Sequence, residues 1–344
     1  MHIQARRIFR LALVPSLALA AAYALQMPLP FIAPLFAFIL TSIPGSPLPA
    51  KKIIGLILLV IITLGFGIIL IPLLLHFQFS AILLVAVGLY LSSYLTVNLN
   101  KNLPGAFMAM GLTMVSAAGT VNDVLATLII QSLIFGIIIA SICQALVYPF
   151  FPEKPAPAQT AAAQTDESLK NSEQSNWIAI RSTLIVLPAY LLLLSNPGMY
   201  MPIMMKAVLL SQQSSTLDTR SAARELIGST FMGGVFAVLL WLGLGIWPNL
   251  WMFFLWILLI SLYFSCKIYR LIQTRLTASF WLNTAITMLI LIGPAVEDSN
   301  SGKDVYSAFF IRLSLFIGIT LYALVAVYLL EYLRSRKRKG SYAV

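Results

Sequence analysis

Apolar residues are gathered along the chain into twelve stretches of roughly 16 to 28 residues, separated by short polar segments. A helix needs about 20 apolar residues to cross a bilayer, whereas a membrane-spanning β-strand would show about 10 residues of alternating polarity. The pattern therefore predicts an all-α polytopic membrane protein with about twelve transmembrane helices. The predicted spans are 11–26, 28–45, 53–75, 79–97, 103–118 and 124–149, then 179–195, 199–214, 225–246, 249–265, 273–294 and 305–332.

A polar segment, residues 151–177, separates the first six spans from the last six and is rich in Pro, Ala, Gln and Ser. Such a composition cannot bury enough apolar surface to fold alone, so it predicts a flexible cytoplasmic linker. We expect residues 1–150 and 178–333 to form two six-helix transmembrane units, followed by a basic cytoplasmic tail at 334–344.

Short matches between the two halves predict that one arose by duplication of the other. "KKIIG" and "RELIG" both begin a third span, and "LYLSS" and "LYFSC" occur in the fourth spans. The sixth spans align without a gap, "DVLATLIIQSLIFG" against "DVYSAFFIRLSLFI", from Asp123 and Asp304. An even number of spans in each copy gives both copies the same orientation. We therefore expect two parallel repeats related by a pseudo-twofold axis along the membrane normal.

The composition supports a membrane protein and explains its positive charge. The chain is 60% hydrophobic and 10% charged, against about 25% charged residues in soluble domains. Its Lys and Arg residues fall almost entirely in alternate loops, which places both termini in the cytoplasm. The excess of 22 basic over 11 acidic residues then reflects topology and contact with lipid phosphates, and no nucleic-acid partner is expected. The first residues also fit a cleaved signal peptide, although cleavage would break this alternation.

The second span of each half carries prolines, at Pro34 in the first copy and at Pro202 in the second. A proline inside a span frees a backbone carbonyl and kinks the helix. In transporters built from repeats, broken spans at matching positions mark the binding site. Lys206 follows Pro202 by one turn, about 10 Å below the predicted outer surface. It either extends to the outer headgroups or lines an aqueous cavity and attracts an anion.

Arg312, eight residues into the twelfth span, is a second predicted membrane cation, and Gln131 takes its place in the first copy. We expect Lys206 and Arg312 to contact an anionic substrate together, because guanidinium binds carboxylates bidentately. The alternative for Arg312 is an ion pair with a nearby outer acid such as Asp304. Tyr200 and Gln212, near the two ends of the eighth span, complete the predicted substrate contacts.

Asp123 and Asp304 begin the sixth spans, where a carboxylate caps a helix and complements its dipole. A weaker interpretation makes them proton-coupling groups. The two histidines and the two cysteines do not form a metal-binding or disulfide pattern. The sequence lacks a phosphate-binding "GxxxxGK[ST]" motif and a catalytic cluster, so neither an enzyme nor a cofactor is expected.

Local motifs suggest a family. The basic start, "PLPFIAPLFAFIL", the "GSPLPAKK" turn and "LVYPFFP" at the end of the first unit resemble the fusaric acid resistance and aromatic acid exporter superfamily. Within it, the chain looks most like the compact bacterial branch described as a domain of unknown function (DUF2955-like). The resemblance implies an inner-membrane efflux component for aromatic or other organic acids, driven by protons and working with a periplasmic adaptor of the membrane-fusion type.

The leading functional hypothesis is a secondary exporter of organic carboxylate anions. A passive anion channel is the first alternative, and a non-transporting membrane scaffold for an envelope complex is the second. The sequence leaves open whether the chain forms a homo-oligomer.

Overall fold

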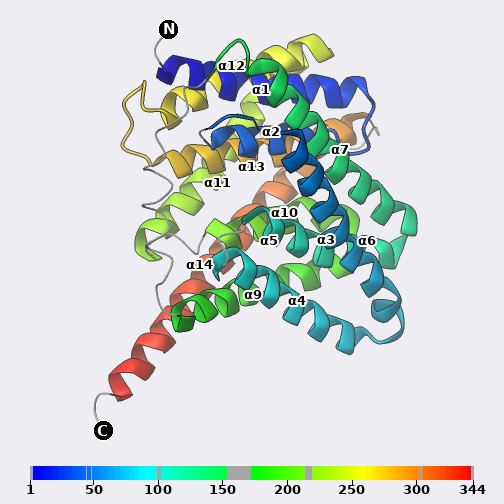
Figure 1. The fold of residues 1–344 in the computed structure, drawn as a ribbon, viewed down its shortest axis with the longest axis vertical. Helices are drawn as coiled ribbons and strands as arrows, with labels where there is room; N and C mark the ends of the chain where they lie inside the picture. The colour runs from blue at the N-terminus through cyan, green and yellow to red at the C-terminus, as the bar shows by residue number, and fades with distance from the viewer. Residues whose placement is uncertain are drawn as a thin grey trace. The chain divides into compact units, whose positions relative to one another are not determined.

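The structure is a computed structural model that describes residues 3–43, 45–47, 49–98, 102–152, 172–213, 219–300, 302 and 304–341. The described residues form helices and connecting turns (Figure 1). The first half contains α1 (Ile3–Ala24), α2 (Ile32–Ser42), α3 (Ala50–His76), α4 (Gln78–Asn98), a continuous run of α5 (Asn102–Met110), the π-helix η1 (Gly111–Val115) and α6 (Ser116–Val121), and α7 (Asp123–Val147). The second half contains α9 (Ser172–Ser195), α10 (Pro197–Gln213), α11 (Thr219–Ile246), α12 (Leu250–Ile268), α13 (Ala278–Asn300) and α14 (Val305–Ser341).

Each predicted span corresponds to one helix when α5, η1 and α6 are taken together, so the all-helical fold class is confirmed for the described residues. Ten of these helices are long and apolar enough to cross a membrane. The exceptions are the two second spans, α2 with 11 residues and α10 with 17. At 1.5 Å per residue they are about 17 and 26 Å long, short of a ~30 Å hydrocarbon core.

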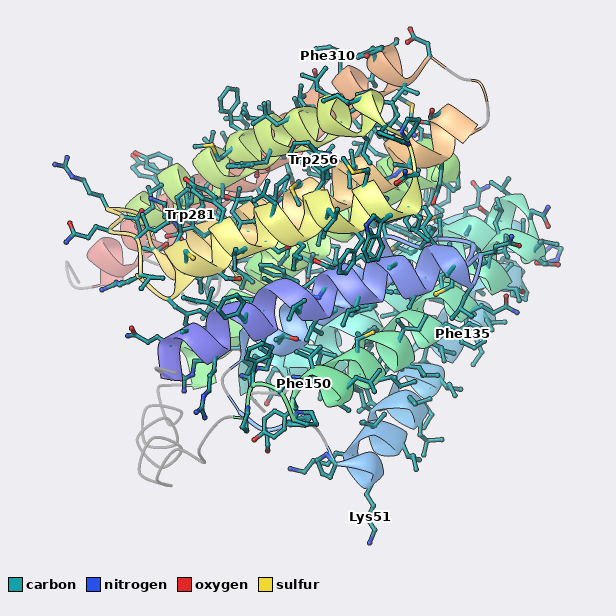
Figure 2. All side chains as sticks on the ribbon, turned by 90° about the horizontal axis from the view of Figure 1, so that it is seen from above. Lys51, Phe135, Phe150, Trp256, Trp281 and Phe310 are labelled. Atoms are coloured by element: carbon teal, nitrogen blue, oxygen red, sulfur yellow. The ribbon has the colours of Figure 1, made fainter. Side chains whose placement is uncertain are left out.

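Large apolar side chains cover the outside of many of the long helices, which supports a multi-pass membrane protein. Phe79 on α4 is 92% exposed and Ile69 on α3 is 72% exposed. Phe135 on α7 and Phe310 on α14 are also exposed and labelled among the outer side chains in Figure 2. A soluble protein rarely exposes such continuous apolar surface. Lys51, at the start of α3, extends away from the ribbon in the same view.

The described chain folds into two compact units, and each unit takes segments from both halves of the sequence. Unit 1 comprises residues 1–62, 127–166 and 228–313, and unit 2 comprises residues 63–126, 167–227 and 314–344. Boundaries between the units fall within α3, α7, α11 and α14. Most of the predicted linker, residues 153–171, lies outside the described residues, and α9 begins at Ser172, within the last part of the predicted linker 151–177.

In unit 1, α1 packs along α12 and α2, and α13 contacts both α12 and α2. Helix α2 is enclosed on nearly every side, because nine of its eleven residues are buried. The Arg10 side chain is 1% exposed, and its Nη1 donates a hydrogen bond to the Gly45 carbonyl oxygen at 3.2 Å, just after α2. The same guanidinium lies 5.8 Å from the centre of the Tyr148 ring. Arg10 therefore connects α1 to the chain that follows α2 and to the chain that follows α7.

In unit 2, α9 packs against α4 and α10, and α10 contacts α5, η1 and α6. Helix α10 is as enclosed as α2, with buried residues on all its faces from Pro202 to Val208. Gly111 in η1 allows a close approach to α3, since a Cβ there would lie 2.5 Å from the Thr63 carbonyl oxygen. The centre of unit 2 is therefore a short proline-containing helix against a π-helical turn.

Candidate functional site

Lys206 lies in the interior of unit 2. Only 2% of the residue is exposed, and its neighbours Met205, Ala207 and Val208 are fully buried. Pro202, one helical turn before Lys206, is also buried. A lysine that reached out to lipid headgroups would expose its stem and its ammonium group. The burial of Lys206 therefore favours a protein-lined environment over the lipid-facing alternative.

The π-helical turn η1 forms one wall beside α10. Thr113 within it is fully buried, and its Oγ1 donates to the Ala109 carbonyl oxygen at 2.6 Å. Ser116 follows directly and is also fully buried; its Oγ lies 3.2 Å from the Tyr190 hydroxyl of α9. Single π-helical turns within α-helices occur frequently at functional sites. The sequence analysis did not identify this turn or its hydroxyl groups.

The pairing of α9 with α10 brings a second buried cation into this region. The two helices form an antiparallel hairpin across Asn196, and Ser182 Oγ donates to the Ser211 carbonyl oxygen at 3.4 Å. In this register Lys206 lies opposite a point on α9 between Arg181 and Tyr190. Measured along the helix axis, it is within about 9 Å of the level of either residue. Arg181 is 6% exposed. Its charge was counted as a topology signal in the sequence, which is why it was missed as a site residue.

Lys206 and Arg181 are of the residue types that bind oxyanions in proteins. A guanidinium binds a carboxylate through two parallel hydrogen bonds, and an ammonium group acts as a point charge. The Ser116 hydroxyl donates to the Leu112 carbonyl oxygen and also lies within hydrogen-bond distance of the Tyr190 hydroxyl, so both hydroxyls take part in hydrogen bonds within the protein. A cluster of side chains suited to a metal ion does not occur among the described residues.

The other predicted substrate contacts are divided between the units. Tyr200 on α10 is half-buried, whereas Gln212 is helical but its side chain lies outside the described residues. Pro34 is buried in α2 of unit 1, and Gln131 is exposed on α7 of the same unit. The structure therefore joins Pro202, Tyr200 and Lys206 on one helix, and assigns Pro34 and Gln131 to the other unit.

Arg312 belongs to unit 1 and forms an ion pair with Asp298 of α13, with Nη1 and Oδ2 2.5 Å apart. The structure agrees with the ion-pair alternative for Arg312, but the partner is Asp298 and not Asp304, the example that the sequence offered. The reason is that α13 continues to Asn300, six residues beyond the predicted end of the span. Glu297 lies beside this pair, within electrostatic range of both Arg312 and Asp298. Lys206 and Arg312 are therefore parts of different units, each with its own neighbours.

The predicted capping role is confirmed for Asp304. Its Oδ1 accepts hydrogen bonds from the Tyr306 and Ser307 backbone N–H groups at 3.2 and 3.4 Å. At the corresponding start of α7 the capping side chain is Asn122, whose Oδ1 accepts from Val124 N–H at 2.9 Å. Asp123 is the first helical residue there and is exposed.

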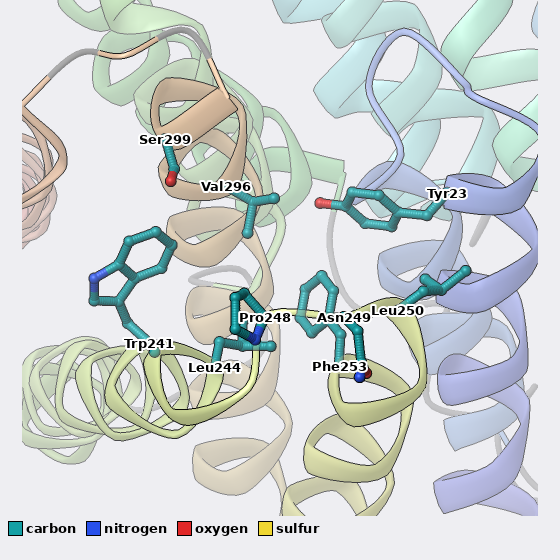
Figure 3. A pocket seen from close by; sticks show the side chains of 10 residues that line it. Tyr23, Trp241, Leu244, Pro248, Asn249, Leu250, Phe253, Val296 and Ser299 are labelled. Carbon is teal, nitrogen blue, oxygen red and sulfur yellow. The ribbon is translucent and has the colours of Figure 1, made fainter.

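A pocket of about 530 Å³ lies in unit 1 at the C-terminal end of α13 (Figure 3). Its lining is mostly apolar and aromatic, with Trp241 and Tyr23 on opposite sides and the Tyr23 hydroxyl directed inward. Tyr23 also packs edge-on against Phe253, with ring centres 5.3 Å apart. The hydroxyl oxygen is buried, and Glu297 lies within electrostatic range of it. This pocket and its neighbouring acids were not anticipated from the sequence.

A family model described as "Protein of unknown function (DUF2955)" matches residues 7–147. The match covers the first half of the chain and agrees with the branch that the sequence motifs resemble. Because that family is uncharacterised, the wider relation to fusaric acid and aromatic acid exporters stays a prediction. Neither the curated proteins nor the solved structures contain a match. The first half of this membrane protein is thus similar to the DUF2955 family.

Proposed function

We propose that this chain is a secondary exporter that moves organic anions, in particular aromatic carboxylates, across the bacterial inner membrane. The observation that carries the proposal is the burial of Lys206 on α10, a proline-containing helix shorter than a membrane crossing. An ionisable residue inside a membrane protein is costly to insert and marks a functional site by default. Arg181 on α9, the helix that packs against α10, provides a further group for carboxylate oxygens.

In this proposal the chain consists of two related halves, an architecture common among transporters. Helices that are equivalent in the sequence repeat have equivalent neighbours within the units. The first span of one half packs against the fourth span of the other half, as α1 with α12 and α9 with α4. The second span of one half contacts the fifth span of the other, as α2 with α13 and α10 with α5 and η1. These matched contacts support an origin by duplication.

Two parts of the proposal rest on the resemblance to the aromatic acid exporters. The driving force is a proton gradient, and a periplasmic adaptor of the membrane-fusion type receives the exported anion. In the proposed topology both termini are cytoplasmic, in agreement with the distribution of Lys and Arg along the sequence.

Flux into proteoliposomes tests the function. Purified protein is reconstituted and the uptake of a panel of aromatic carboxylates is measured with and without a pH gradient. We expect saturable uptake that a pH gradient accelerates, and we expect Lys206→Met to abolish it while Lys206→Arg retains part of it. Lys51→Met serves as the control, because Lys51 is an exposed cation at the start of α3. Uptake that ignores the pH gradient would indicate the channel, and no uptake of any carboxylate would overturn the proposal.

A further inference from the structure

A second group of charged side chains belongs to unit 1. Asp298 and Glu297 occupy the last turns of α13, and Arg312 extends from the second turn of α14. The side chains of Arg312 and Asp298 are only 11% and 10% exposed. Glu297 has a buried carboxyl oxygen, Oε1, and lies within electrostatic range of both partners.

The charges in this group do not balance when all three residues are ionised. Two carboxylates and one guanidinium leave one net negative charge, and Asp298 already forms the ion pair with Arg312. A second ionised carboxylate beside the first loses hydration because it is buried, and the first carboxylate repels it. The attraction to Arg312 offsets these two costs only in part. A proton on one carboxyl group neutralises the excess. Two carboxyl groups in close proximity commonly share a proton in this way.

We propose that Glu297 is the proton-exchange site of the exporter, the group that loads and releases the coupled proton. This inference rests on the proposed function and adds to it the residue that couples transport to protons. Arg312 and Asp298 act as positioning residues that hold the fixed charges around Glu297. The positive-inside pattern puts this end of α13 on the outer face, so the carboxyl group takes its proton from outside.

The surroundings of Glu297 fit this role. Within the part of the chain that the structure describes, Tyr23 of α1 and Arg312 of α14 are titratable or charged groups that interact with Glu297 from other helices. The neighbouring helix α2 and the adjoining ends of α11 and α12 are apolar or neutral in sequence. A pocket lies at the same turn of α13, lined by Tyr23 and by Val296 and Ser299, the residues on either side of the acid pair; Glu297 and Asp298 are not among its lining residues (Figure 3). Water in that space would provide the route by which a proton reaches the carboxyl group.

The acids predicted earlier are less suited to the task. Asp123 and Asp304 are exposed at helix starts, where water stabilises their charge, and Asp304 also accepts two backbone hydrogen bonds. A group that must hold a proton in one state and release it in another needs a less solvated position. Glu297 occupies such a position and Asp304 does not.

Infrared spectroscopy of the full-length protein in nanodiscs tests the site without any transport substrate. We expect a carboxylic-acid C=O band in acidic buffer that is lost on alkalinisation, and that shifts when glutamate is labelled with ¹³C at its side-chain carboxyl. Glu297→Gln should remove the band, whereas Glu225→Gln, at another buried glutamate, and Asp304→Asn should retain it. The labelling experiment uses the unaltered chain, so it remains decisive if Glu297→Gln does not fold. A band that is absent, does not shift with labelled glutamate, or persists in Glu297→Gln overturns the inference.

Flux then separates this inference from the proposed function. One pH unit is a tenfold difference in proton activity, so each coupled proton supports up to about tenfold accumulation of the anion. Glu297→Gln should lose this accumulation while retaining exchange of labelled for unlabelled anion without a gradient. If the unaltered protein transports no carboxylate, the exporter proposal fails, even where the infrared band identifies Glu297 as a proton site. If Glu297→Gln still accumulates the anion, the coupling role fails and the exporter proposal stands.

Discussion

The ion pair between Arg312 and Asp298 can be tested by a double-mutant cycle, with Arg312→Met and Asp298→Asn as the single changes. Both side chains keep only about a tenth of their surface exposed, so the pair resembles a buried ion pair more than a surface one. Removing one partner of a buried pair costs about 3 to 5 kcal/mol, against about 0 to 1 kcal/mol for an exposed pair. We expect Arg312→Met to lower the free energy of unfolding by about 3 kcal/mol, because it leaves Asp298 and Glu297 together without their cation.

The two single changes should not lower the free energy of unfolding by the same amount. After Asp298→Asn the guanidinium still has the Glu297 carboxyl group in its neighbourhood, so the expected loss is smaller, about 1 to 2 kcal/mol. The double variant should lose no more than Arg312→Met alone, which gives a coupling energy of about 1 to 2 kcal/mol. Equilibrium unfolding in mixed micelles of a mild detergent and dodecyl sulfate, followed by circular dichroism, measures these differences.

A second cycle with Asp304→Asn is the control, because Asn caps a helix about as well as Asp. Arg312→Met and Asp304→Asn should be additive within about 0.5 kcal/mol. If coupling is found with Asp304 and not with Asp298, the helix end and the ion pair described here are both refuted.

Two further predictions concern the packing and the capping of helices. Gly67→Ala in α3 should destabilise the protein by about 1 to 3 kcal/mol, since the new Cβ would overlap the backbone of Gly111. Gly65→Ala, two residues away with open space around it, should not destabilise the protein. Equal losses of stability in the same unfolding assay would contradict the close approach of α3 to Gly111. Asn249→Ala should lower the free energy of unfolding by about 1 kcal/mol, because it removes the cap of α12, in which the Asn249 Oδ1 accepts a hydrogen bond from Met252 N–H at 2.7 Å. Asn249→Asp should preserve the stability. If Asn249→Asp destabilises the protein as much as Asn249→Ala, the capping role is ruled out.

The sequence was sufficient for the positions of the helices because the length of an apolar run directly reflects the thickness of a bilayer. It was also sufficient to single out the second spans, which are the two short helices and contain Pro34 and Pro202. Lys206 was found because a charge inside an apolar run is conspicuous. In each of these cases the relevant physics is local in the chain.

The helix ends and the polar partners were harder to predict, because they depend on the backbone and on neighbours far away in sequence. Hydropathy falls at Glu297 and Asp298, yet the helix continues to Asn300, and that continuation decides which acid meets Arg312. Asn122 and Asp123 are both good capping residues by type; the extended backbone of Asn122 selects it. The π-helical turn has no composition of its own, so the wall beside Lys206 was invisible in the sequence.

Arg10 also takes on a meaning that its charge alone does not suggest. Helix α2 ends after about 17 Å of rise, and the chain that leaves it passes the second helical turn of α1, where Arg10 donates to the Gly45 carbonyl. This carbonyl lies beyond the last turn of α2, so it has no partner within that helix and takes one from elsewhere. If α2 were longer, a backbone N–H of its next turn would donate to this carbonyl. The guanidinium of the neighbouring helix donates that hydrogen bond instead. An arginine that topology rules count as a marker of the cytoplasmic side is thus a backbone ligand that makes a shortened span tolerable.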